Sequence, residues 1–256
     1  MPAMSLPISV QLYTVRGLTA TDFPGTMKQI ARIGYPAVEM AGFGNLKTAA
    51  EARKALDDAG LKVSGSHAPI ERLENELDKV LDENDTLGNK NLICPWMPEA
   101  RRKDAAAWKQ VAQSLNRIGR AAHERGFEFA YHNHSFEFQK FDGQTALDIL
   151  FTNTDPHLVK AEIDVYWVKH GGEDPVTRIN KLTGRIMSLH LKDMAAGADK
   201  KFAEVGTGIL DFKSILTAAE KAGVQWGVVE QDDTYGVPPL EAIKVSFENL
   251  KKLGAG

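Results

Sequence analysis

Four polar residues, His132, Asp164, His190 and Glu230, each end a separate apolar run typical of a β-strand. The runs are EFAYH, VKAEID, RIMSLH and WGVVE, and each is followed by loop-like sequence and a helical pattern. In a closed parallel barrel the carboxyl ends of the strands converge on one mouth, so these side chains would meet there. Two imidazoles and two carboxylates together predict a divalent metal site.

The expected cofactor is one divalent ion. Imidazole suits Zn, Co, Fe or Mn, and carboxylates also tolerate Mg, so we rank Mn first, with Zn, Co or Mg as alternatives. Such an ion polarises a carbonyl group and stabilises the enediolate formed when a neighbouring C–H proton is removed. The candidate bases, and hence catalytic residues, are Glu230, Glu137 and His134.

The segment YHNH leaves the first ligand open. Alternation along the strand places His132 and His134 on one face, with Tyr131 and Asn133 on the other. His132 is the favoured ligand and Glu137 its rival, while His134 is a candidate for acid/base chemistry or substrate contact. For Asp164, a carboxylate in an apolar run, burial requires either a cation or several hydrogen-bond donors.

The rest of the chain supplies the elements that would position these residues. Eight short apolar runs alternate with eight amphipathic stretches, which predicts a single (β/α)8 TIM barrel over residues 1–256. The third amphipathic stretch, from Ile70 to Gly88, reads as one helix, and another spans about Asp104 to Arg125. The sixth β-like run is expected to continue past Asp164 as VKAEIDVYWV, before the stretch PVTRINKLTG. A doubly wound open sheet is the alternative, but no GxGxxG follows the first strand.

Composition narrows the range of partners. The net charge of −3, with both signs interspersed, offers no basic face for nucleic acid, and no apolar run is long enough for a membrane helix. The single cysteine, Cys94, excludes an intramolecular disulfide and fits a reducing cytoplasm. The opening MPAMSLPISV lacks signal-peptide features, so we expect a cytoplasmic protein, with a removed export leader left open. A homo-oligomer also remains open.

The motifs HNH, EIDVYW, SLHLKD, EVGTGILDF and VVEQD, in this order, resemble the sugar phosphate isomerase/epimerase family, which has a xylose isomerase-like barrel. Relatives in that superfamily include inosose dehydratases, ketose 3-epimerases and endonuclease IV. The resemblance implies a Glu, Asp, His, Glu metal set from strands five to eight, and its last three members fall on Asp164, His190 and Glu230. The first falls on His132, a departure from the family pattern.

The resemblance also implies roles outside the metal set. Glu39 and His67 would contact substrate, and Lys192 would bind an oxygen or phosphate. Trp96 follows the fourth strand and would line the substrate pocket or an interface. The GTG in EVGTGILDF precedes a helix, so its backbone N–H groups would either host an anion or form an ordinary turn.

These features favour a metal-dependent isomerase or epimerase acting on a sugar, keto-sugar or cyclitol as its small-molecule substrate. In the family's epimerases both glutamates act as bases, so a histidine at position 132 disfavours that symmetric mechanism. A one-base isomerase, or a dehydratase or lyase assisted by His134 or Glu137, is the alternative. A non-catalytic sugar-binding barrel and an endonuclease IV-like phosphodiesterase rank lower.

Overall fold

The computed structural model describes residues 6–256, so the opening Met1–Ser5 lies outside the described part of the chain. Eight parallel strands close into a barrel in the order β1-β12-β9-β8-β5-β4-β3-β2. The predicted (β/α)8 TIM barrel is therefore confirmed. The barrel strands are β1 Ile8–Gln11, β2 Ala37–Met40, β3 Lys62–His67, β4 Asn91–Cys94, β5 Glu128–His132, β8 Lys160–Asp164, β9 Ile186–Leu191 and β12 Trp226–Val229.

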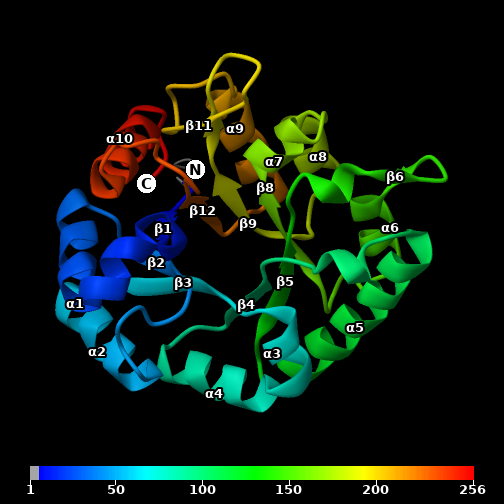
Figure 1. Cartoon of the computed structure of the whole chain (residues 1–256), viewed down its shortest axis with the longest axis horizontal. Helices are drawn as coiled ribbons and strands as arrows, with labels where there is room; N and C mark the ends of the chain where they lie inside the picture. The colour runs from blue at the N-terminus through cyan, green and yellow to red at the C-terminus, as the bar shows by residue number, and fades with distance from the viewer. Residues whose placement is uncertain (1–5) are drawn as a thin grey trace.

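Helices surround the ring of strands on the outside (Figure 1). Two short hairpins, β6 Lys140–Phe141 with β7 Gln144–Thr145 and β10 Asp193–Met194 with β11 Phe202–Ala203, follow the fifth and seventh barrel strands. Single 3₁₀ turns are η1 Leu12–Val15, η2 Glu99–Arg101 and η3 Phe136–Phe138. The α-helices are α1 Arg16–Ile33, α2 Ala49–Ala59, α3 Ile70–Asn75, α4 Leu77–Thr86, α5 Ala105–Glu124, α6 Ala146–Thr152, α7 Val165–His170, α8 Pro175–Lys181, α9 Phe212–Ala222 and α10 Pro239–Lys252.

Local sequence explains where these helices begin and end. Asp104 accepts the backbone N–H of Ala107 and starts α5 one residue after the expected start of that helix. At α2, Thr48 and Glu51 form a reciprocal capping box. Gly60 ends α2 in a left-handed conformation that a residue without Cβ adopts at little cost.

Two expectations about elements were wrong. The stretch expected as one helix from Ile70 onward is broken at Glu76, whose φ of −137° and ψ of 30° are not helical, and so forms α3 and α4. The run VYWV, expected to extend the sixth barrel strand, instead forms α7. The Asp164 carboxylate accepts the backbone N–H of Trp167 at 3.0 Å and thereby caps this helix.

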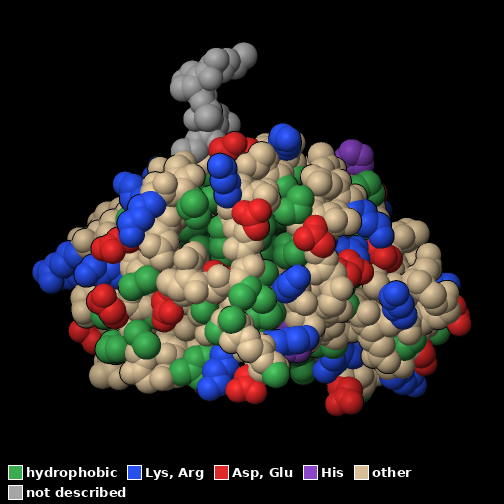
Figure 2. Space-filling model, turned by 90° about the horizontal axis from the view of Figure 1, so that it is seen from above, with side chains coloured by type: hydrophobic (Ala, Val, Ile, Leu, Met, Phe, Trp, Pro, Cys, Tyr) green, Lys and Arg blue, Asp and Glu red, His purple; other side chains and the backbone are tan. Residues whose placement is uncertain are grey.

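The outer surface carries charges of both signs. On the face shown in Figure 2, acidic and basic side chains are interspersed. Across residues 6–256, every helix falls short of the length or the apolarity that a bilayer crossing demands. Several charged and polar side chains, His132, Asp164, His190 and Glu230 among them, are instead buried inside the barrel.

Candidate functional site

A cavity of about 600 Å³ opens at the carboxyl ends of the barrel strands. This volume suits a small polar ligand. Its lining includes six residues expected at the site from the sequence: His67, Trp96, His132, His134, Lys192 and Glu230. The other lining residues are Tyr13, Ala41, Gly42, Pro69, Arg72, Pro95 and Asp232.

Two buried histidines lie at the centre of the site and divide it in two. The rings of His132 and His190 are 4.5 Å apart between centroids. The Nδ1 atom of His132 faces Glu162, whereas its Nε2 atom faces Asp164. The Nε2 atom of His190 faces Glu162 and its Nδ1 atom faces Glu230. Each imidazole therefore connects an inner cluster to an outer cluster.

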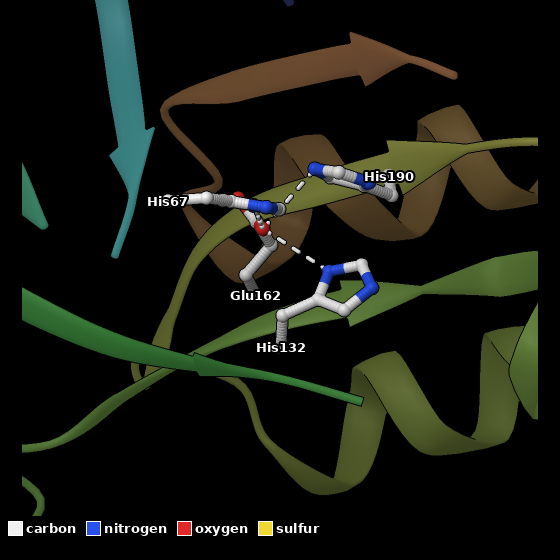
Figure 3. Close-up of side chains that lie close together, drawn as sticks. All are labelled: His67, His132, Glu162 and His190. Carbon is white, nitrogen blue, oxygen red and sulfur yellow. Dashed lines mark hydrogen bonds and ion pairs between the residues drawn. The ribbon is translucent and has the colours of Figure 1, made fainter. Parts of the chain in front are cut away.

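The inner cluster consists of His67, Glu162 and Glu39 with the two shared histidines. Figure 3 shows the Glu162 carboxylate pointing toward three imidazoles. Its Oε1 atom lies 2.9 Å from His67 Nε2, 3.1 Å from His132 Nδ1 and 3.1 Å from His190 Nε2. The Oε1 atom of Glu39 adds contacts of 3.1 Å to His67 and 2.7 Å to His190.

The pKa values of the three inner imidazoles shift in different directions. Burial and, to a smaller extent, the neighbouring His190 lower the pKa of His132 to about 3. For His67, burial acts in the same direction but is outweighed by Glu39 and Glu162, which raise its pKa to about 9. Glu162, Glu39 and Glu230 likewise overcome burial and raise the pKa of His190 well above its usual value. Without a metal ion, the inner cluster thus holds positive charge on His67 and His190.

The outer cluster consists of Asp164, Glu230, Asp232 and Lys192. The Lys192 ammonium is buried and lies 3.1 Å from Asp164, 2.7 Å from Glu230 and 3.0 Å from Asp232. Burial would lower the pKa of Lys192, but Asp164 and Glu230 raise it well above its usual value. Lys192 therefore stays charged and supplies the outer carboxylates with a permanent counter-ion.

The outer carboxylates respond unequally to their surroundings. Burial raises the pKa of Asp164 to about 6 despite the neighbouring Lys192. Burial also raises the pKa of Asp232, and the charge of Glu230 adds to the shift. In Glu230, by contrast, Lys192 and His190 outweigh burial and hold the pKa well below its usual range. Asp232 can thus carry a proton more readily than Glu230.

His134 differs from the clustered histidines. Its ring lies 5.0 Å from that of His132, as strand alternation predicts, and it lines the cavity. Burial lowers the pKa of His134 well below its usual value, with contributions from His132 and Lys192. Within residues 6–256, its buried Nδ1 atom has no hydrogen-bond partner. A neutral imidazole with a free nitrogen at the cavity is available to a ligand.

Glu137, the rival first ligand, lies apart from both clusters. Its carboxylate accepts the hydroxyl of Tyr131 at 2.7 Å and the backbone N–H of His134 at 2.8 Å. Tyr131 projects to the opposite side of β5 from His132, and its ring meets Trp108 of α5 edge-on. Burial raises the pKa of Glu137 to about 7. Its contacts fix the backbone that carries His134.

The backbone N–H groups of the GTG loop already bind a carboxylate of this chain. The buried Asp193 carboxylate accepts backbone N–H groups of Gly206 at 3.0 Å, Gly208 at 2.9 Å, Leu210 at 3.1 Å and Met194 at 2.7 Å. A Cβ atom at Gly208 would lie 2.4 Å from Asp193 Oδ1 and 2.2 Å from the Met194 carbonyl oxygen, so glycine is required there. The sequence suggested an anion-binding loop, and the anion it binds is internal.

The other expected substrate contacts fall in different places. Trp96 lines the cavity and is 45% exposed, so its indole is accessible to a ligand. Glu39 is buried in the inner cluster and is not among the residues that line the cavity. Glu162 and Asp232 were not among the site residues predicted from the sequence. Each lies two positions from a chosen residue, Asp164 or Glu230, and this spacing was the available signal.

The donor set fits a divalent cation. Nitrogen and carboxylate oxygen atoms from two groups, His67/His132/Glu162/His190 and His132/Asp164/His190/Glu230, lie within 4.8 Å of one another in each group. The second group is the set expected from the sequence, and the structure brings its members together. Its Asp164 Oδ2 atom, although near Lys192, accepts no hydrogen bond from residues 6–256. Buried, convergent donors of these types are those that transition metals prefer.

The family described as xylose isomerase-like TIM barrel matches residues 27–253. The chain belongs to this family. A solved sugar phosphate isomerase/epimerase from Parabacteroides distasonis aligns with a TM-score of 0.82 and 24% identity over 96% of each chain. An IolI protein with a bound zinc atom aligns with a TM-score of 0.76 and 13% identity, over 97% of this chain and 98% of that one. At these identities, both structures show the shared xylose isomerase-like fold.

Curated relatives of this xylose isomerase-like chain include inosose dehydratases. That of Lacticaseibacillus casei is 30% identical over 152 residues, or 52% of this chain and 50% of the relative. That of Clostridium beijerinckii is 29% identical over 166 residues, or 57% of this chain and 55% of the relative. The matches thus span about half the length of these relatives.

Proposed function

We propose that this chain is a lyase that removes water from a cyclic polyol ketone, either a keto-cyclitol or a keto-sugar. The observation that carries the proposal is the Nδ1 atom of His134, which has no hydrogen-bond partner within residues 6–256 and belongs to a ring that lines the same cavity as Lys192. A neutral base beside a fixed cation is the pairing needed to remove a proton α to a carbonyl group. The similarity to inosose dehydratases favours dehydration over the isomerisation or epimerisation that the sequence motifs first favoured.

In this mechanism His134 accepts the α-proton, and the positive charge of Lys192, which lines the same cavity, stabilises the enolate oxygen that develops. The C–O bond to the β-hydroxyl then breaks as the enolate electrons form a new double bond. Asp232, whose pKa is raised, donates a proton to the departing hydroxide, and water leaves. A divalent cation bound through His132 and His190 would polarise the ketone.

Two further residues have supporting roles in the proposal. Glu137 is a positioning residue, because its carboxylate holds the backbone N–H of His134. Trp96 offers an exposed aromatic face at the cavity, against which the carbon face of a polyol ring can pack. The aromatic wall and the buried acid and base together favour a small polar substrate.

The test is an NMR assay in deuterated water with an inosose as the cyclitol ketone. We expect exchange of the α-proton for deuterium together with loss of the β-hydroxyl to give an enone. The variant His134→Asn should lower kcat by about 10²–10⁴-fold, the range for loss of a general base. The control His123→Asn, at an exposed position on α5, should retain the wild-type rate.

The assay also separates the alternatives. Exchange without enone formation would assign isomerisation or epimerisation to the same site. An absence of exchange with any keto-cyclitol or keto-sugar, in protein loaded with metal, would overturn the proposal and favour a sugar-binding barrel. Wild-type activity in His134→Asn would exclude that histidine as the base.

A further inference from the structure

The inner cluster lacks the permanent cation that the outer cluster has. Across residues 6–256, the ion pairs of Glu39 and Glu162 involve histidine alone, and both carboxylates are buried. The outer carboxylates, by contrast, share the Lys192 ammonium. Two buried carboxylates need two positive charges nearby, because an unpaired buried charge is strongly unfavourable.

The three imidazoles of the inner cluster are packed closely together. The rings of His67 and His190 are stacked with centroids 5.4 Å apart and planes 9° apart, and the ring of His132 lies 4.5 Å from that of His190. One divalent ion shared by these imidazoles would supply the positive charge that the two buried carboxylates need.

The donor atoms of the inner cluster also converge as metal ligands do. The three imidazole nitrogens lie 2.9–3.1 Å from one carboxylate oxygen of Glu162 (Figure 3). In a tetrahedral zinc site with bonds of about 2.0–2.1 Å, neighbouring ligand atoms lie about 3.3 Å apart. The Glu162 oxygen therefore lies near coordination spacing from each imidazole nitrogen, and all four donor atoms lie within 4.8 Å of one another.

Three members of the inner cluster, Glu162, Glu39 and His190, are held by hydrogen bonds to residues around the cluster. Ser188 donates to the second oxygen of Glu162 at 2.6 Å, and Gln11 donates to Glu39 at 2.7 Å. The Nδ1 atom of His190 lies 2.7 Å from Glu230, so a metal-bound Nε2 would leave an N–H facing a carboxylate. Carboxylates and hydroxyls that orient ligands in this way are characteristic of metal centres.

We propose that the inner cluster, rather than the outer one, is the metal site of this chain. The ligands are His67, His132, His190 and Glu162, with Glu39 as a neighbouring acceptor that balances charge. Three imidazoles and one carboxylate favour zinc or cobalt over the manganese expected from two of each. The outer carboxylates Asp164 and Glu230 then pair with Lys192 instead of the ion. This inference does not rest on the proposed reaction, because ion binding is measured without substrate.

The experiment measures metal binding in matched variants of the whole chain. Protein stripped with a chelator is titrated with Co²⁺, and both the visible d–d spectrum and the bound metal per chain are recorded. We expect one ion per chain in the wild type. His67→Ala and Glu162→Gln should lose more than about 100-fold in affinity, beyond the cost typical of second-shell changes. Asp164→Asn changes only a neighbour of His132 Nε2, so its loss should stay below about 100-fold, the upper end for residues that orient a ligand. The exposed control His123→Ala should bind within about threefold of wild type, since surface changes cost little.

The outcomes decide between the two clusters. Loss of binding in Asp164→Asn with retention in Glu162→Gln would overturn the proposal in favour of the set expected from the sequence. Equal losses in both variants, or no binding by the wild type, would overturn it as well. Glu162→Gln keeps the shape of the side chain and an acceptor for Ser188, so it tests the charge and ligand even where His67→Ala fails to fold.

Discussion

The inner and outer clusters both contact His132 and His190, and they contain two and three carboxylates respectively, but they balance the carboxylate charge differently. In the outer cluster a single lysine ammonium lies within 3.1 Å of three acids. In the inner cluster the only nitrogen partners of Glu162 within ion-pair distance, among the described residues, belong to imidazoles. Side chains of the same types thus form a salt-bridge network on one side and the proposed metal ligands on the other. The presence of one long cationic side chain makes the difference.

The largest expected effect comes from removing that side chain. Lys192→Met keeps the length of the chain but leaves three carboxylates without their counter-ion, so we expect a loss of about 3–5 kcal/mol in the free energy of unfolding. Urea denaturation measures the loss. Lys181→Met is the matched control, because Lys181 is 54% exposed and pairs with Asp148 at the surface, where loss costs about 1 kcal/mol or less. Equal effects of the two substitutions would break the comparison.

A smaller change can perturb the inner cluster alone. A Cβ atom at Gly65 of β3 would lie 2.8 Å from Glu39 Oε2 and 2.8 Å from Ile93 Cδ1. Gly65→Ala should therefore cost about 1–3 kcal/mol of stability through overpacking and weaken Co²⁺ binding. Gly17→Ala is the control, since nothing lies within 4 Å of its added Cβ. Unchanged metal affinity in Gly65→Ala, with the expected loss of stability, would show that Glu39 is not coupled to the ion.

The smallest expected effect is on the pH dependence of stability at Asp148, which pairs with the permanent cations Arg178 and Lys181 among the helices outside the barrel. Burial alone would raise the pKa of Asp148, but Lys181 and Arg178 lower it. Because the pKa of Asp148 in the folded state lies below its unfolded value, its contribution to stability is present above that unfolded value. The contribution is lost as the pH falls through the folded pKa.

Urea midpoints of wild type and Asp148→Asn, measured between about pH 6 and about pH 2, should converge as the pH falls. Taking the difference between the two proteins removes the contribution of the clustered carboxylates, which protonate in both. A difference that stays constant with pH would mean that the Asp148 charge adds nothing to stability.

Much of the fold was accessible from the sequence, because each apolar run and its following amphipathic stretch carry an independent signal. The break at Glu76 and the early start of α7 were not, since the hydrophobic pattern continues through both positions. The Asp164 carboxylate decides the second case by capping the helix. A residue chosen as a ligand thus also determines local backbone structure.

For the site, spacing predicted the meeting of His132, Asp164, His190 and Glu230, which the structure brings together. Their roles as ligands stay a prediction. The pattern of polar residues at strand ends did not indicate Glu162, because Glu162 lies two residues before the end of β8. It nevertheless lies on the same face of that strand as Asp164. The sequence could not show which ring nitrogen faces which carboxylate. It also could not show that the long Lys192 side chain ends among three acids, because both depend on side-chain rotation.

Asp193 determines what the GTG loop can bind. Four backbone N–H groups, the kind of donors that elsewhere bind a phosphate, are already occupied by its carboxylate. These four donors are therefore not available to an external anion such as a phosphoryl group. Removal of the carboxylate would leave all four N–H groups without their acceptor, so the side chain that blocks the loop also holds its shape.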